Sequence, residues 1–146
     1  MQDSLDIMLP ERMRIPALPL AGTLVFPYAL TPLVIDGEPS IELVTRVANS
    51  TEKLIALFPE IPEEEDKENT LPPSEVETFM MDGKKLSEIG VAGRIVKHVK
   101  FPDGTDRVLI RGLTRIRFRE FHPEDHSVEV ARIPKAENDS VEVSAM

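Results

Sequence analysis

Two histidines four residues apart are the first residues in this chain that could bind a metal. The segment reads His122-Pro123-Glu124-Asp125-His126, so two acids separate the two imidazoles. On a helix, positions i and i+4 share one face, and such a pair would chelate a cation. Pro123, however, interrupts any helix that would run through the pair. The segment therefore predicts a solvated turn and no metal site.

No motif for catalysis or for cofactor binding is complete. The Gly83-Lys84-Lys85 run has Thr78 where a phosphate-binding loop has its first glycine, and Lys85 where that loop has its hydroxyl residue. No serine lies in a Gly-x-Ser-x-Gly frame. The acidic run at 63–66 lacks the glycine and the spaced acids of a calcium loop. We therefore expect no catalytic residue and no cofactor.

A row of basic side chains is the second chemical feature. Arg111, Arg115, Arg117 and Arg119 occupy odd positions of one segment, and alternate residues of a strand share a face. Such a stripe would contact the phosphates of a nucleic acid, or acids of this domain or a neighbouring one. One tyrosine, no tryptophan and a net charge of −9 argue against nucleic acid, because little is available for base stacking.

This basic row belongs to the segment around which the chain is organised. Residues 90–121 read as a strand, the turn Phe101-Pro102-Asp103-Gly104 and a long second strand. Apolar and β-branched residues alternate with polar ones along the second strand, which predicts one buried face. The predicted inward positions are Val108, Ile110, Thr114, Ile116 and Phe118. Gly112 interrupts them and would allow a bulge that curls the sheet.

The other elements are short because thirteen prolines break the chain. The patterns predict an edge strand at 15–20, an irregular stretch at 24–32, a helix at 39–50, and strands at 33–35, 53–58 and 128–133. Residues 1–14 are expected to be a flexible tail. Residues 60–85 are expected to be an acidic mobile loop with a short ordered piece at 76–81, since nine acids face one lysine over 60–82.

These elements predict a mainly β (α+β) fold: an antiparallel pseudobarrel of about six short strands with one helix. A doubly wound sheet would need more helices for its crossovers. The 146 residues suit one domain. The absence of cysteine favours a cytoplasmic protein, and the absence of a long apolar window predicts no membrane partner.

Several short motifs follow one another in a recognisable order. They are Leu18-Pro19-Leu20, Val25-Phe26-Pro27, Pro32-Leu33, Ser40-Ile41, Ile89-Gly90-Val91-Ala92, Pro102-Asp103-Gly104 and the stretch from Val108 to Arg115. Together they span about residues 15–133, and the series resembles the N-terminal domain of the Lon family of ATP-dependent proteases. One departure is Tyr28, which stands where the family usually has glycine after the Phe-Pro pair.

The resemblance implies a PUA-like pseudobarrel over 15–134, with a truncated helical region beginning at 135–146. It implies a non-catalytic domain that recognises unfolded or damaged polypeptides and helps a homo-oligomer assemble. Its partners would be the ATPase and serine–lysine peptidase modules of a parent chain. A free-standing adaptor and a PUA-like nucleic-acid-binding module are the alternatives.

Capture of an unfolded chain requires exposed apolar groups on a rigid frame. Phe26, Tyr28 and Leu30 lie in the proline-broken stretch, and Phe101 lies at the hairpin tip. We expect these four residues to bind substrate. The sequence leaves open the alternative that Phe26 and Leu30 close the end of the barrel instead.

Overall fold

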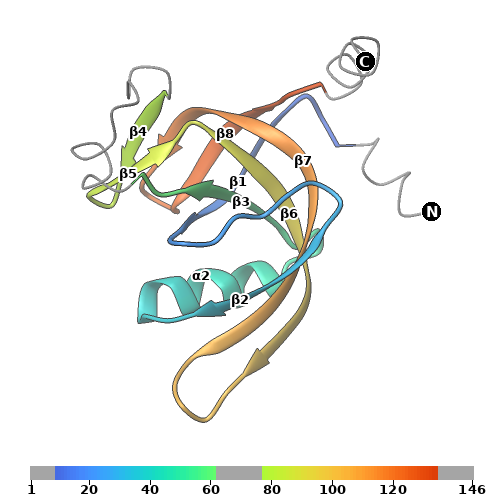
Figure 1. Ribbon diagram of the computed structural model, residues 1–146, viewed down its shortest axis with the longest axis vertical. Coiled ribbons are helices and arrows are strands. Elements are labelled where there is room, and N and C mark those ends of the chain that lie inside the picture. Colours follow the sequence, from blue (N-terminus) through green and yellow to red (C-terminus); the bar gives the residue numbers. More distant parts are fainter. Residues whose placement is uncertain (1–8, 62–76, 135–146) are drawn as a thin grey trace.

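The structure is a computed structural model that describes residues 9–61 and 77–134. Its main sheet contains β1 (Arg12–Leu20), β2 (Leu30–Ile35), β3 (Leu54–Pro59), β6 (Ile89–Lys100), β7 (Asp106–His122) and β8 (Ser127–Arg132). The strand order is β2-β7-β6-β3-β1-β8, and β7 also pairs with β8, which curls the sheet into a barrel. Helix α2 (Glu38–Ala48) lies beside the barrel, and a separate hairpin joins β4 (Thr78–Met81) to β5 (Lys84–Ser87) (Figure 1). The mainly β pseudobarrel with one helix is therefore confirmed in the described part of the chain.

Strand β1 is central, so the prediction of an edge strand at 15–20 was wrong. It runs parallel to β3, with Ala17 opposite Ala56, and antiparallel to β8, with Ile15 opposite Val128. The parallel pair also means that the sheet is not purely antiparallel. Each proline removes only one donor, and the other backbone groups of a nine-residue strand maintain the pairing. The strand begins at Arg12, so residues 12–14 belong to β1 and not to a flexible tail.

Two further boundaries differ from the sequence prediction. Residues 30–32 are the start of β2 rather than irregular chain. Residues 78–87 form the β4–β5 hairpin, although the acidic loop was predicted to extend to 85. Phe79 holds this hairpin on the barrel, because its ring stacks on Phe118 at a centroid distance of 3.7 Å and meets Phe58 edge-on at 5.1 Å. The remainder of the predicted mobile loop (62–76), most of the predicted tail (1–8) and the predicted helical start (135–146) lie outside the described residues.

The core has two parts, one on each side of the strongly curved sheet. Leu43, Val44 and Val47 of α2 pack with residues such as Ile55 and Ile110 in the first part. The second part gathers the phenylalanine cluster with the buried side chains of β8 and the later half of β7. Both faces of β3 and β6 are therefore buried for much of their length, which makes the barrel a rigid frame.

Strand β7 changes partner at Gly112. Its first third pairs with β2, from Ile35 opposite Asp106 to Leu30 opposite Arg111, and residues 116–122 at its other end pair with β8. The pairing with β6 shifts register at this point, which confirms the bulge predicted at Gly112. The Gly112 amide donates to the Ala29 carbonyl at 2.9 Å, and its carbonyl accepts from the Tyr28 amide at 2.7 Å. The segment before β2 is thus fastened to the middle of β7.

Replacing Gly112 with alanine should loosen this attachment. A Cβ atom at Gly112 would lie 2.1 Å from the Phe26 carbonyl oxygen, so the backbone must move. We expect the free energy of unfolding to fall by about 1–3 kcal/mol, the usual cost of overpacking. Urea denaturation measures it. The matched control is Gly104→Asn, where no atom lies within 4 Å and asparagine tolerates a positive φ. Equal losses in both variants would contradict the account.

A buried carboxylate supports the part of the β6–β7 hairpin that extends beyond the barrel (Figure 1). Asp106 is only 3% exposed. It accepts a hydrogen bond from His98 Nε2 at 2.6 Å and another from Lys100 Nζ at 3.2 Å. The His98 hydrogen bond lowers the pKa of Asp106 below its ordinary value, and Lys100 adds to this effect.

This lowered pKa makes the stability contribution of Asp106 depend on pH. The ionised carboxylate stabilises the fold above the unfolded-state pKa of about 3.9, and that contribution is lost as the pH falls through the lower folded-state pKa. Asp106→Asn should therefore lower the free energy of unfolding by about 1.5–3 kcal/mol at neutral pH, with the difference narrowing below about pH 4. Urea denaturation at several pH values measures it. The exposed Asp36→Asn is the control, and a pH-independent Asp106→Asn effect would be the contrary result.

Candidate functional site

A loop at residues 24–30 presents a row of apolar side chains to solvent. Leu24, Phe26, Tyr28 and Leu30 are each 50–55% exposed. Val25 lies between them and is 5% exposed, so it fills the end of the barrel and anchors the loop. We call residues 24–30 the apolar loop. Phe26 and Leu30 are half-exposed, so each has surface available for a partner.

Tyr28 has a backbone conformation that costs energy. Its φ is 71°, in the left-handed region that glycine adopts most easily. This is the position at which the sequence departs from the Lon pattern, which usually has glycine. The chain thus accepts a strained residue at the point where the apolar loop meets Gly112, and it places an aromatic ring there with half its surface exposed.

Two substitutions at Tyr28 should distinguish the effect of losing the aromatic ring from the effect of relieving the backbone strain. Tyr28→Ala and Tyr28→Gly both remove the aromatic side chain, but only glycine relaxes the positive φ. We expect the glycine variant to be the more stable of the two by about 1 kcal/mol, despite its larger unfolded-state entropy. Thermal denaturation of the two variants gives the difference. An alanine variant as stable as the glycine variant would show that the backbone carries no strain here.

The apolar loop continues into an exposed face of the sheet. Leu33, Ile35, Val108 and Ile110 point into the core that α2 covers, so the alternate residues of β2 and β7 point away from it. We call this face of β2, β6 and β7 the outer sheet face. Its exposed apolar members are Leu30, Pro32, Val34, Val96, Val99 and Phe101.

Phe101 lies at the far end of this face. The Arg107 guanidinium carbon is 4.1 Å from the centroid of its ring, and the residue is 40% exposed. The hairpin tip and the apolar loop are separated by the paired length of β2, roughly 17 Å at 3.4 Å per residue. The four predicted binding residues therefore mark the two ends of one surface rather than one pocket. Sequence reasoning missed Val34, Val96 and Val99 between them, because their shared face depends on strand register.

The four arginines of the predicted basic stripe do not form one continuous row. Register shifts in β7 at Gly112 and between Phe118 and Glu120 change the spacing of the four side chains. Arg117 pairs with Glu77 at 3.1 Å and with Glu88 at 3.8 Å. Arg111, Arg115 and Arg119 have no carboxylate partner among the described residues. Arg115 borders a small apolar pocket of about 110 Å³ beneath Phe26.

A larger hollow lies on another side of the molecule. A groove of about 720 Å³ runs between α2 and the turn that joins β7 to β8. His126 forms part of its wall, with Nε2 2.6 Å from the Asp82 carboxylate and Nδ1 3.1 Å from the Ala17 carbonyl oxygen. Leu18 and Leu43 also border this groove. Residues 123–126 form a turn, as predicted, whereas His122 ends β7, and the two histidines bond to different partners.

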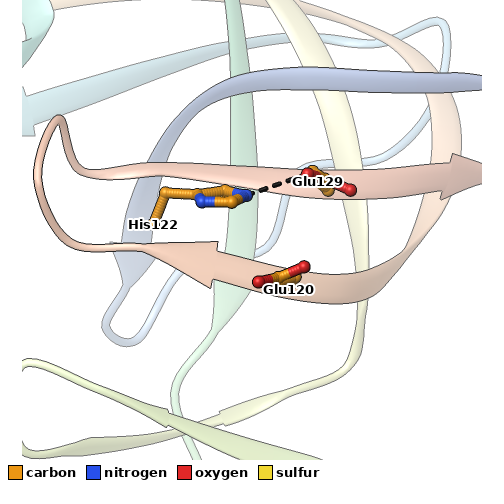
Figure 2. Close-up of side chains that lie close together, drawn as sticks. All are labelled: Glu120, His122 and Glu129. Carbon is orange, nitrogen blue, oxygen red and sulfur yellow. Dashed lines mark hydrogen bonds and ion pairs between the residues drawn. The ribbon is translucent and has the colours of Figure 1, made fainter.

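A third cluster combines two carboxylates with an imidazole. Ligand atoms of Glu120, His122 and Glu129 lie within 4.8 Å of one another, and His122 Nε2 is 2.9 Å from Glu129 (Figure 2). Such a set could hold a divalent cation, with the residues coming from both strands of the β7–β8 hairpin. Spacing along the chain did not reveal it, since Glu129 belongs to the next strand. Arg14 stands opposite Glu129 on β1, but its guanidinium pairs with Glu124 and Asp125.

Comparison with known proteins shows the family to which the chain belongs. A family model described as the ATP-dependent protease La (LON) substrate-binding domain matches residues 14–146. The chain belongs to this family. It is 29% identical to the Lon protease of Rhizobium meliloti over 133 residues, which cover 90% of this chain and 15% of that protease. It is 37% identical to the Lon protease of Dictyoglomus thermophilum over 107 residues, which cover 73% of this chain and 12% of that one. The matching part is thus a small share of these relatives.

Solved structures of Lon N-terminal domains share the fold. The N-terminal domain of the Mycobacterium avium complex Lon protease matches with a TM-score of 0.59 and 14% identity, over 84% of this chain and 56% of that one. The Lon N-terminal domain protein from Xanthomonas campestris matches with a TM-score of 0.50 and 18% identity, over 84% and 59%. The resemblance to Lon seen in the sequence is therefore confirmed. None of the helices in the described residues has the length and apolar character needed to cross a membrane.

Proposed function

We propose that this Lon substrate-binding domain captures unfolded or damaged polypeptides through the apolar loop and the outer sheet face. The observation that carries the proposal is the row of half-exposed apolar side chains from Leu24 to Leu30, continued by Val34, Val99 and Phe101. A contiguous exposed apolar surface on a well-packed frame is typical of a protein-interaction site. The positive φ of Tyr28 is consistent with the same surface, since strain is often found at functional positions, but Lys53, Asp82 and His126 share this conformation.

The proposed capture is weak for one domain. A flexible chain loses conformational entropy when it is ordered on a surface, and this loss offsets much of the gain from burying a few side chains. We expect a Kd of about 1 µM or weaker for the isolated domain. Several domains in one ring would raise the overall affinity through effective concentration.

The proposed context is a Lon-type protease. There the domain would act with the ATPase and serine–lysine peptidase modules of its parent chain and would help a homo-oligomer assemble. This chain would contribute recognition rather than ATP or peptide hydrolysis. We propose a cytoplasmic location, which the absence of cysteine supports. A free-standing adaptor built from the same domain would use the same surface.

A binding titration tests the proposal. Fluorescence anisotropy of a labelled, reduced and permanently unfolded protein would be followed at about 50 and 200 mM salt, without ATP. Phe26→Ala and Phe101→Ala should each weaken binding by about three- to tenfold, as expected for anchors worth about 1 kcal/mol. Met80→Ala is the matched control, because Met80 is 60% exposed but lies on β4, away from this surface. It should leave the affinity unchanged.

The same titration distinguishes nucleic-acid binding. Phosphate contacts would weaken steeply over that salt range, whereas apolar capture would change little. A parallel titration with RNA and DNA, using Arg115→Ala/Arg117→Ala, covers that alternative. The proposal fails if the phenylalanine variants bind the unfolded protein as tightly as the wild type does. In that case, nucleic-acid binding abolished by the arginine substitutions would replace it.

A further inference from the structure

Two arginines face each other across neighbouring strands on the outer sheet face. Arg94 of β6 lies directly opposite Arg111 of β7, and Leu30 of β2 lies opposite Arg111 on its other side. Two guanidinium groups and an exposed leucine therefore form one row across three strands. Both arginines are partly buried. This row lies at the boundary between the apolar loop and the rest of the outer sheet face.

This pair lacks a counter-charge within the two described ranges. Two other arginines of β7 have carboxylate partners, since Arg107 lies 3.7 Å from Asp103 and Arg117 lies 3.1 Å from Glu77, whereas Arg115 and Arg119 have none among the described residues. Neither Arg94 nor Arg111 has such a partner. Like charges directly opposite each other on a sheet are destabilising, and partial burial increases the cost. The arrangement favours an anion supplied from outside the domain.

We propose that the Arg94–Arg111 pair binds a carboxylate of the captured polypeptide. This inference rests on the proposed function and gives it a substrate class: extended segments in which Asp or Glu alternates with apolar residues. A guanidinium group matches a carboxylate through two parallel hydrogen bonds. Leu30 and Val34 lie on the same face of the sheet as the pair and would contact the apolar neighbours of that carboxylate.

Charge complementarity identifies the occupant. The register places Arg94, Lys97, Arg107 and Arg111 on the outer sheet face, where Asp103 pairs with Arg107, whereas the whole chain has a net charge of −9. An acidic segment is therefore attracted to this face and repelled elsewhere, which orients it on approach. A nucleic acid would also be attracted by the positive charge of this face, but its bases need exposed rings on which to stack. The outer sheet face offers mainly aliphatic side chains and one aromatic ring, Phe101, which has Arg107 on one side and is 40% exposed, so little surface is available for base stacking.

Three labelled twelve-residue peptides test this selectivity. They share leucine and valine at alternate positions and carry Glu, Gln or Lys at the others. Anisotropy titrations should show the Glu peptide binding about tenfold more tightly than the Gln peptide, and the Lys peptide more weakly still. In Arg94→Gln/Arg111→Gln, the Glu and Gln peptides should bind equally, at the affinity of the wild type for the Gln peptide. The control Arg12→Gln/Arg46→Gln removes the same charge from exposed positions and should keep the preference for Glu.

Thermal stability gives an independent readout. Because the pair repels itself, Arg94→Gln/Arg111→Gln should melt at the same temperature as the wild type or higher. A purely structural role for the two arginines predicts a lower melting temperature. A clear decrease would therefore overturn the proposal, whatever the peptide affinities show.

The remaining outcomes separate this inference from the proposed function. If the Gln peptide binds and Phe26→Ala weakens it, but the Glu peptide has no advantage, only the inference fails. If none of the peptides and no unfolded protein binds, both fail. A single-stranded oligonucleotide that binds more tightly than the Glu peptide, and loses binding in Arg94→Gln/Arg111→Gln, would assign the pair to nucleic acid. Self-association in sedimentation that the same variant abolishes would assign it to a second copy of this chain.

Discussion

The close approach of two backbones at Gly112 is the contact on which the functional surface depends. The apolar loop sits so near β7 that no side chain fits between them, and two hydrogen bonds hold it there. The same residue lies where β7 leaves β2 and turns toward β8. One bulge therefore bends the barrel, starts β2 in register and fixes the loop whose side chains face solvent. Without it, the exposed apolar residues would have no rigid frame.

Two energetically unfavourable features lie on this surface, although Lys53, Asp82 and His126 elsewhere also have a positive φ. Tyr28 has a left-handed backbone conformation, and Arg94 and Arg111 repel each other across the strands. The barrel tolerates them because its two cores are well packed on both sides of the sheet. Local violations of folding rules are often found at functional sites. The groove beside α2 is larger, but its charged groups such as His126 and Asp82 bond to each other.

Local signals in the sequence predicted the elements that depend on neighbouring residues. Proline and glycine placed the β6–β7 turn, and the period of apolar residues placed α2 and the buried face of β7. The sequence predictions were wrong where contacts between residues far apart in the chain determine the structure. β1 is central because β3 and β8 both pair with it, and the β4–β5 hairpin is ordered because Phe79 stacks on Phe118. Arg94 lies opposite Arg111 only because of the register between β6 and β7 beside a bulge. This register cannot be predicted from residue spacing along one strand.

The central claim is that the apolar loop and the outer sheet face together form the polypeptide-binding surface. Backbone amide chemical shifts, measured by NMR during titration with an unfolded protein, test it most directly. The account predicts that the perturbed amides cluster at 24–30, 94–101 and 107–111. Perturbations confined to α2 and the turn at 122–126, with the outer sheet face unchanged, would contradict it and move the binding site to the groove lined by His126.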